Sequence, residues 1–279
     1  MKNKEKTEGG VMRSLFHTSD SDSDSSYDET LSVSRHVEKI KYGEGELQVV
    51  YHLDWAAPGH GDALWNSCRV IARLLLNAPP SSPYLPLSPP SIALEFGSGA
   101  ALPSMCLMKL GCPLVLSTDQ PGSESTFAAI EKSARSNADT WGVPKTVAAL
   151  PLQWGAGSGA VLERTGGRKV DLLIASDCIY DPSYHSDLLE SAGGLISKDG
   201  TFVVGYSLHN NVPEGRVEKF FDLARGGGWK VREERTERFE RQNAAPWDDS
   251  KTRGDVYVKV LVRERGGGEG EGAAIEGDL

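Results

Sequence analysis

Several features that would assign a chain to a common functional class are missing from this sequence. It contains no run of 18 apolar residues and no apolar stretch behind its first residues, so neither a membrane span nor a signal peptide is predicted. No G-x-S-x-G elbow accompanies the serines, which leaves nucleophilic hydrolysis without an anchor. The histidines form no i, i+4 pair, so we expect no metal site.

Cysteine and positive charge are also scarce. Cys68, Cys106, Cys112 and Cys178 form no C-x-x-C pattern and fall in apolar segments, so we expect reduced core residues of a cytoplasmic protein. The formal net charge is -9 and no local basic patch is present, so nucleic acid is not an expected partner.

The length and composition favour one folded domain between two tails. The chain has 279 residues, of which 39% are apolar, enough to bury a substantial core. Residues 1–38 are polar and include a tract that alternates serine with acid, and residues 265–279 are rich in glycine and glutamate. We therefore expect disordered tails at 1–38 and 265–279 and a folded domain at 39–264, which we expect to be monomeric.

Strand and helix patterns alternate within the folded part. Asp62 is expected to cap the first helix, and Pro103 fits the first turn of the second. Strands are expected at 47–51, 91–96, 113–118, 146–150, 169–176, 201–206, 229–232 and 255–262, helices at about 62–75, 124–138, 183–196 and 215–225, and a glycine-rich loop at 155–167.

This order predicts an α/β fold. Strands separated by helices form right-handed crossovers and therefore a parallel sheet, whereas the last two strands have only a loop between them. We expect a Rossmann-like, doubly wound sheet of seven strands, mostly parallel, with an antiparallel last strand. Its ligand crevice would lie at the carboxyl ends of the strands.

The most informative motif is Glu95-Phe96-Gly97-Ser98-Gly99, at the end of an apolar strand. Gly97 and Gly99 allow a tight turn and a close approach to a ligand, because they have no Cβ. Asp119 ends the next strand, 20 residues after Gly99, where a carboxylate can accept both ribose hydroxyls. The motif predicts a nucleoside site; the alternative is a tight turn without a ligand.

Two ligand classes use this geometry, and the details separate them. A dinucleotide fingerprint needs a third glycine, but Leu102 stands there, and Glu95 would place a negative charge beside the phosphates. An acid in that position suits the ammonium and sulfonium groups of S-adenosylmethionine, which is the ligand that we predict.

Two further motifs follow later strands of the predicted sheet. Leu152-Gln153-Trp154-Gly155 follows the third strand, where the indole can cover an adenine or pack in the core. Asp177 and Tyr180 follow the fourth strand, beside the glycine loop in this topology, and are a candidate acceptor site. Taken alone, Asp177 would be a cap or turn residue and Tyr180 a packed aromatic.

Together these motifs resemble the seven-strand methyltransferases of family 16, most of which methylate protein lysines. Within this family the chain looks similar to a subgroup that includes an elongation factor 1-alpha N-terminal and lysine methyltransferase, although Ala101 replaces a common glycine. The matching segments span about residues 45–262. They are Leu64-Trp65, Glu95-Phe96-Gly97-Ser98-Gly99, Thr118-Asp119, Asn137, Leu152-Gln153-Trp154-Gly155 and Ser176-Asp177-Cys178-Ile179-Tyr180-Asp181-Pro182.

The resemblance implies an S-adenosylmethionine-dependent protein N-methyltransferase acting on a lysine or an N-terminal amine, with elongation factor 1-alpha as a candidate partner. A small-molecule N-methyltransferase of the nicotinamide type and a non-catalytic cofactor-binding module are the alternatives. The implied cofactor-binding residues are Trp65, Glu95, Gly97, Ser98, Gly99, Asp119, Trp154 and Ser176, and the implied catalytic residues are Asp177 and Tyr180.

Overall fold

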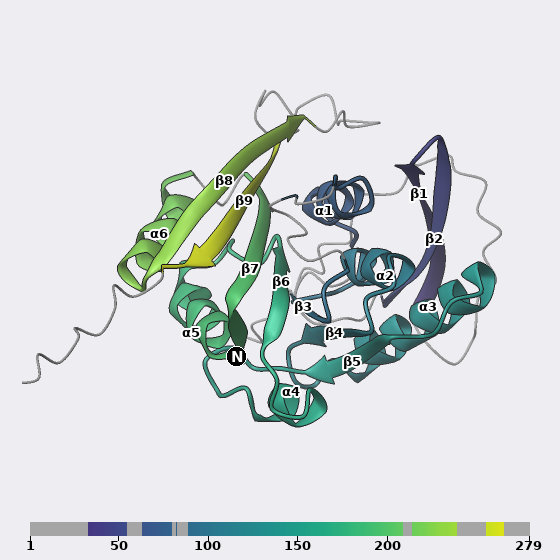
Figure 1. Cartoon of the computed structure of the whole chain (residues 1–279), viewed down its shortest axis with the longest axis horizontal. Coiled ribbons are helices and arrows are strands. Elements are labelled where there is room, and N and C mark those ends of the chain that lie inside the picture. Colours follow the sequence, from purple (N-terminus) through teal and green to yellow (C-terminus); the bar gives the residue numbers. More distant parts are fainter. Residues whose placement is uncertain are drawn as a thin grey trace, which may run out of the picture.

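A seven-stranded sheet with helices on both faces forms the body of the protein, and a separate hairpin packs beside it (Figure 1). The computed structural model describes residues 33–54, 63–79, 82, 89–208, 214–238 and 255–264. Most of the predicted tails lies outside these residues, as does Asp62.

The strands of the main sheet stand in the order β5-β4-β3-β6-β7-β9-β8. β3 to β7 run parallel to one another, whereas β9 lies between β7 and β8 and is antiparallel to both. The predicted fold class, with an antiparallel last strand, is confirmed. The strands are β3 (Ile92–Phe96), β4 (Leu114–Asp119), β5 (Val147–Pro151), β6 (Val170–Ser176), β7 (Ile196–Ser207), β8 (Trp229–Arg238) and β9 (Asp255–Arg263).

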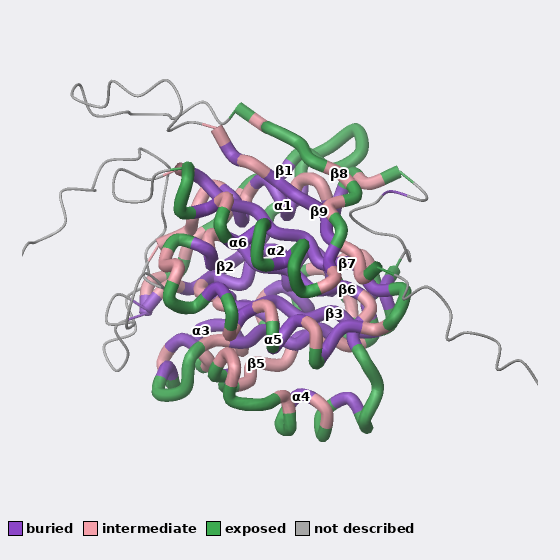
Figure 2. Tube along the Cα trace, turned by 90° about the vertical axis from the view of Figure 1, so that its left-hand side faces the viewer, coloured by how far each residue is buried: buried purple, intermediate pink, exposed green. Residues whose placement is uncertain are grey.

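Alternate residues of the central strands pack into two cores, one on each face of the sheet. On β3, Ala93 belongs to the first core and Leu94 to the second. The first core is closed by α1 (Asn66–Leu76), α2 (Leu102–Lys109) and α3 (Glu124–Trp141), and the second by α4 (Gly159–Arg164), α5 (His185–Leu195) and α6 (Glu214–Gly226). Figure 2 shows that the central strands, which lie between these helix layers, are mostly buried.

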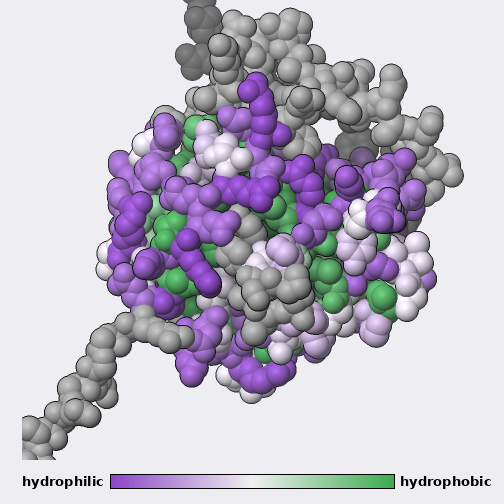
Figure 3. Space-filling view, turned by 45° about the horizontal axis from the view of Figure 1, so that its top comes forward, coloured by the Kyte–Doolittle hydropathy of each residue, from purple (hydrophilic) through white to green (hydrophobic). Residues whose placement is uncertain are grey.

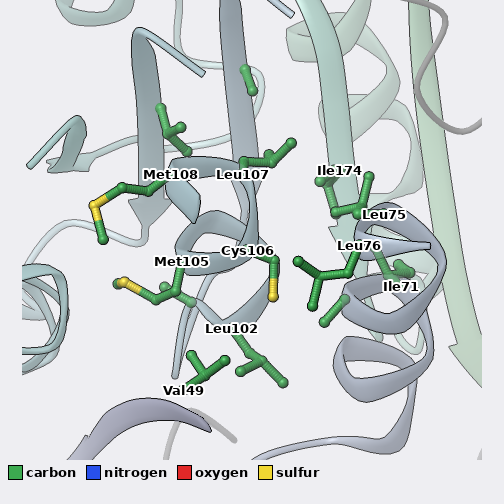
Figure 4. Close-up of a cluster of buried hydrophobic side chains, with 14 of the residues drawn as sticks. Val49, Ile71, Leu75, Leu76, Leu102, Met105, Cys106, Leu107, Met108 and Ile174 are labelled. Atoms are coloured by element: carbon green, nitrogen blue, oxygen red, sulfur yellow. The ribbon is translucent and has the colours of Figure 1, made fainter. Parts of the chain in front are cut away.

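The contact between α1 and α2 fills part of the first core. Leu102 and Cys106 on α2 lie toward Leu76 on α1, while Met105 and Met108 point toward the other side of α2 (Figure 4). Each of these side chains is at most 5% exposed. On the face that Figure 3 shows, hydrophobic residues appear in gaps between hydrophilic ones.

The start of the folded part differs from the prediction. β1 (Val33–Tyr42) pairs with β2 (Gly45–Asp54) in an antiparallel hairpin along its whole length, so residues 33–38 belong to the hairpin and not to the tail. β1 is mostly polar, and its order comes from pairing with β2, which local composition does not reveal.

Other elements also differ from their predicted bounds. The N-cap of α1 is Trp65, without a side-chain cap, so Asp62 is not the cap that the sequence suggested. The predicted glycine-rich loop contains α4. β8 continues six residues beyond the predicted end at Arg232, because its polar residues pair with β9. None of the described helices is long and apolar enough to cross a bilayer.

Candidate active site

The predicted site residues gather where β3, β4 and β6 end. These strands are neighbours in the sheet and parallel, so their carboxyl ends share one edge. β3 ends in Glu95-Phe96 and the glycine loop, β4 ends in Asp119, and Ser176 ends β6. The residues predicted from the strand ends therefore lie together at one edge of the sheet.

The glycine loop depends on conformations that other residues rarely adopt. Gly97 and Gly99 have φ values of 52° and 47°. A Cβ on Gly97 would lie 2.9 Å from Cys178 Sγ and 3.6 Å from Trp154 Cζ2, so the close approach here is to the protein's own side chains. Ser98 is buried, and its backbone N–H donates to the Thr118 carbonyl at 2.9 Å.

Glu95 is a carboxyl group held at the base of the crevice. It is 1% exposed, and its Oε2 accepts hydrogen bonds from Ser104 Oγ at 2.6 Å and the Ser104 backbone N–H at 3.1 Å. Its Oε1 is buried and has no partner among the described residues. Burial raises the pKa of Glu95 to about 8, although the bonds from Ser104 oppose the shift and the charge of Asp119 adds to it.

Asp119 ties the end of β4 to the glycine loop. Its Oδ2 accepts from the Gly99 N–H at 3.0 Å, and its Oδ1 accepts from the Gln120 N–H at 2.8 Å. Burial raises the pKa of Asp119, and the two backbone donors oppose this rise. Each carboxylate oxygen keeps further acceptor capacity, which the two hydroxyls of a ribose could use.

The turn that carries Trp154 is docked on the start of α5. The indole packs edge-on against Phe96 and against Tyr184, with ring centroids 6.5 and 6.3 Å away. Gly155 has a φ of 75°, and a Cβ there would lie 2.9 Å from Asp187 Cγ. Its N–H donates to Ser191 Oγ at 2.9 Å. The glycine after Trp154 thus lets this turn approach α5.

Asp177 is fixed at the mouth of the crevice by groups from two elements. Its Oδ1 accepts from the Ser207 N–H at 2.8 Å, and its Oδ2 accepts from Ser67 Oγ at 2.5 Å. Its own N–H donates to the Gly205 carbonyl at 2.8 Å. The predicted acceptor acid is therefore at the predicted place, with its side chain oriented by α1 and β7.

Tyr180, Ser176 and Trp65 complete the predicted set. Tyr180 is 40% exposed, and burial of the rest of its ring raises the pKa of its hydroxyl. Ser176 is buried and continues the alternation of Leu172 and Ile174, which places it on the α1 side of the sheet. Trp65 precedes α1, two residues before the serine that reaches Asp177.

The prediction missed the residues that hold these groups in place. Ser104 bonds Glu95, Ser67 bonds Asp177, and Asp187 lies against Gly155. Ser104 and Ser67 had a detectable signal, because each is a polar residue on the buried side of an apolar helix. Asp187 had none, because its contact depends on how the turn after β5 meets α5.

The residues present fit S-adenosylmethionine. Acidic side chains lie at the ends of β3 and β4 and directly after β6. The cofactor carries an ammonium and a sulfonium group, whose positive charges complement these acids. The buried Glu95 Oε1 is an acceptor without a donor among the described residues, which an ammonium would satisfy. In the described part of the chain, no cluster of three or more His, Cys, Asp or Glu could hold a metal.

Comparison with solved structures agrees on the fold. A candidate methyltransferase solved in complex with SAH superposes with a TM-score of 0.53 at 11% identity, covering 77% of this chain and 54% of that one. A candidate transferase from Pyrococcus horikoshii superposes with a TM-score of 0.50 at 14% identity, covering 84% and 73%.

Comparison of sequences identifies the family. A protein N-terminal and lysine N-methyltransferase, efm7, from Schizosaccharomyces pombe is 26% identical over 66% of this chain and 71% of its own length. Its namesake from Eremothecium gossypii is 27% identical over 78% of this chain and 81% of its own length. The model of the lysine methyltransferase family matches residues 46–225, and this chain belongs to that family.

Proposed function

We propose that this protein transfers a methyl group from S-adenosylmethionine to an amine of another protein, either a lysine side chain or an N-terminal amine. The observation that carries the proposal is the segment from Asp177 to Tyr180, which follows β6 directly beside the glycine loop. It offers a fixed carboxylate and an exposed phenol at the place where an amine would meet the cofactor.

The residues behind this segment would hold the cofactor, which supplies an electrophilic methyl group on sulfur when bound. Glu95 Oε1 would accept a hydrogen bond from the ammonium, and Asp119 would accept from the ribose hydroxyls. The glycine loop, with Ser98, would form the floor. Trp65 and Trp154 would enclose the ligand, and Ser176 would contact it from the end of β6.

The acceptor amine must be neutral to attack the methyl group. A free lysine has a pKa of about 10.4, so presenting it neutral near pH 7 costs about 4–5 kcal/mol. The carboxylate of Asp177 would raise the pKa of the amine, so it attracts and aims the amine and does not assist its deprotonation. The hydroxyl of Tyr180 would accept a hydrogen bond from the amine, or its exposed ring would face the cationic amine.

Elongation factor 1-alpha is the substrate that we propose to test first, with the reaction taking place in the cytoplasm. This choice rests on the resemblance to the subgroup described above and on relatives named for both lysine and N-terminal methylation. The acceptor would then be a lysine or the N-terminal amine of that factor.

The experiment uses the purified full chain, methyl-labelled S-adenosylmethionine and fractionated lysate, followed by mass spectrometry of the labelled species. We expect a labelled polypeptide that carries methyl groups on lysine or at its N-terminus. Label found only in small molecules would overturn the protein substrate and favour a small-molecule N-methyltransferase. Cofactor binding without any labelled product would favour a non-catalytic module.

The role of Asp177 is tested by Asp177→Ala. We expect methyl transfer in steady-state turnover to be abolished, with at most a residual rate measurable in single turnovers, while the dissociation constant of the cofactor, measured by calorimetry, changes by only a few-fold. Asp181→Ala is the matched control, because Asp181 lies in the same segment but its carboxylate caps Ser183 at the surface. Normal turnover in Asp177→Ala would exclude the assignment.

A further inference from the structure

The carboxylate of Asp177 is oriented by a serine of α1. Ser67 lies in the first turn of α1, is fully buried, and donates from Oγ to Asp177 Oδ2 at 2.5 Å. The second oxygen of Asp177 accepts from the Ser207 N–H of β7. A neutral hydroxyl and a backbone amide thus fix both oxygens of the acid.

The approach of α1 to β7 makes the serine contact possible. Gly205 on β7 faces α1, and a Cβ there would lie 2.7 Å from Ile71 Cδ1 and 3.3 Å from Ser67 Cβ. The carbonyl of the same glycine accepts the N–H of Asp177. The absence of a side chain at residue 205 therefore sets how close Ser67 comes to the end of β6.

The backbone of Asp177 is itself strained. Its φ is 54°, a left-handed conformation that L-residues rarely adopt, although aspartate tolerates it better than most. Such a conformation persists only when the surrounding structure imposes it, and it is found preferentially at functional sites. In this conformation the carboxylate accepts hydrogen bonds from Ser67 of α1 and from the Ser207 N–H at the end of β7.

We infer that Ser67 is a positioning residue for methyl transfer, which holds the Asp177 carboxylate in line with the acceptor amine. Because Trp65 lies two residues before Ser67, α1 also connects the acceptor side of the crevice to the residue expected to cover the cofactor. This inference rests on the proposed function and deepens it, because it assigns the orientation of the acceptor acid to a particular hydrogen bond.

The test compares Ser67→Ala with Ser133→Ala in the full-length protein. Ser133 is also a fully buried helical serine, but it bonds His52 of the hairpin, away from the crevice. We expect kcat to fall at least tenfold in Ser67→Ala with the cofactor dissociation constant changed less than threefold. Ser133→Ala should lower the melting temperature while kcat stays within twofold. Equal kcat in Ser67→Ala and the wild type would overturn the inference.

A double-mutant cycle tests whether Ser67 acts through Asp177. Residual transfer in Asp177→Ala and in the Ser67→Ala/Asp177→Ala double variant is measured in single turnovers with labelled cofactor, and unfolding in urea is measured for all four proteins. We expect Ser67→Ala to change transfer less than twofold once Asp177 is absent, and the unfolding free energies to be non-additive. A full, additive effect of Ser67→Ala in both measurements would contradict the inference.

The test of Ser67 can fail independently of the test of the proposed function. If the wild-type protein labels small molecules instead of a polypeptide, the acceptor class is wrong, and the same comparison of kcat with the small molecule decides the role of Ser67. If no acceptor is labelled, the unfolding energies still test the hydrogen bond on which the inference rests: additivity overturns the inference, and a coupling shows that Ser67 orients the Asp177 carboxylate while the proposed transfer has failed.

Discussion

At the scale of single residues, one alanine and one aspartate of this site have an unusual backbone conformation. Among the described residues, Ala101 and Asp177 are the non-glycine residues with positive φ. Ala101 has a φ of 53° and is fully buried at the N-cap of α2, the position at which the family resemblance described above implies a glycine. The departure visible in the sequence is therefore a strained position in the structure.

Replacing Ala101 by glycine should relieve this strain. We expect Ala101→Gly to raise the free energy of unfolding by up to about 1 kcal/mol, because glycine adopts the left-handed conformation without a Cβ penalty. Ala100→Gly is the control, since Ala100 is also buried but has an ordinary φ, and it should lose about 1 kcal/mol. Urea unfolding measures both. A loss of stability in Ala101→Gly would show that the buried methyl contributes more than the strain costs.

The buried carboxyl of Glu95 makes cofactor binding dependent on pH. With a pKa of about 8 in the free protein, Glu95 is protonated near pH 6 and must ionise to pair with an ammonium. The affinity for S-adenosylhomocysteine, which carries the same ammonium, should therefore rise by up to about tenfold per pH unit between pH 6 and 7.5. Calorimetry at several pH values measures this. Glu95→Gln should bind more weakly and without this slope.

The same group affects the stability of the free protein in the opposite direction. Its folded pKa of about 8 exceeds the ordinary value of 4.5, so folding favours the protonated form. The resulting contribution to stability is complete below pH 4.5 and is lost as the pH rises through 8. Glu95→Gln should flatten this part of the stability profile. An unchanged profile in that variant would mean that Glu95 titrates normally.

At the scale of elements, the hairpin is held to the body by side chains of α3. Asn137, fully buried, donates to the Val50 carbonyl at 2.7 Å and accepts from the Val50 N–H at 2.8 Å, as a neighbouring strand would. Asn137 is one of the residues on which the family resemblance rests, but the sequence predicted no role for it. The structure shows that it anchors β2 to α3.

Asn137→Ala should therefore destabilise the protein by about 3 kcal/mol, because it leaves the N–H and C=O of a buried strand residue without partners. Thermal unfolding measures the loss, and hydrogen exchange at Val50 should accelerate. Ser136→Ala is the neighbouring control, since Ser136 bonds only the carbonyl of Lys132 within α3. If both variants unfold at the same temperature, the two hydrogen bonds of Asn137 add nothing measurable to the attachment of the hairpin.

The turn after β5 should be sensitive to a single methyl group. Gly155→Ala places a Cβ against Asp187 and forces the Trp154 turn away from α5, so we expect weaker cofactor binding. Gly157 also has a positive φ, of 100°, but its Cβ position meets open space. Gly157→Ala should lose stability through backbone strain while its cofactor affinity, measured by calorimetry, stays at the wild-type value. If both variants lost affinity equally, the position of the Trp154 turn against α5 would not matter for cofactor binding.

Elements with strong local patterns were predictable from the sequence, and those defined by pairing were not. β6 was predicted to within one residue because its apolar run marks a strand covered on both faces. β1 and the end of β8 are polar and are strands because partners lie beside them. Likewise the positions of Glu95, Asp119 and Asp177 followed from strand ends, while the bonds from Ser104 and Ser67 depend on helix packing.

At the scale of the whole molecule, the sheet is the layer that both cores share. Ile174 of β6 packs into the first core and Leu173 into the second, so neither face can lose its packing without exposing the strands that support the other. β9, the last strand of the described chain, is hydrogen-bonded to both β7 and β8, so the three C-terminal strands belong to the same sheet. The described part of the protein should therefore unfold as one unit.

Matched core truncations on opposite faces test this cooperativity. Leu75→Ala removes a buried side chain from the first core, and Phe220→Ala removes one from the second. Each should cost about 3–5 kcal/mol and shift a single transition, with the same midpoint whether unfolding is followed by tryptophan fluorescence or by circular dichroism. Leu223→Ala is the control, because Leu223 is 47% exposed on α6 and should change the midpoint little. A variant whose fluorescence and circular dichroism change at different midpoints would show that the two faces of the sheet unfold separately. The face that carries α1 and α2 could then open while the second core stays packed.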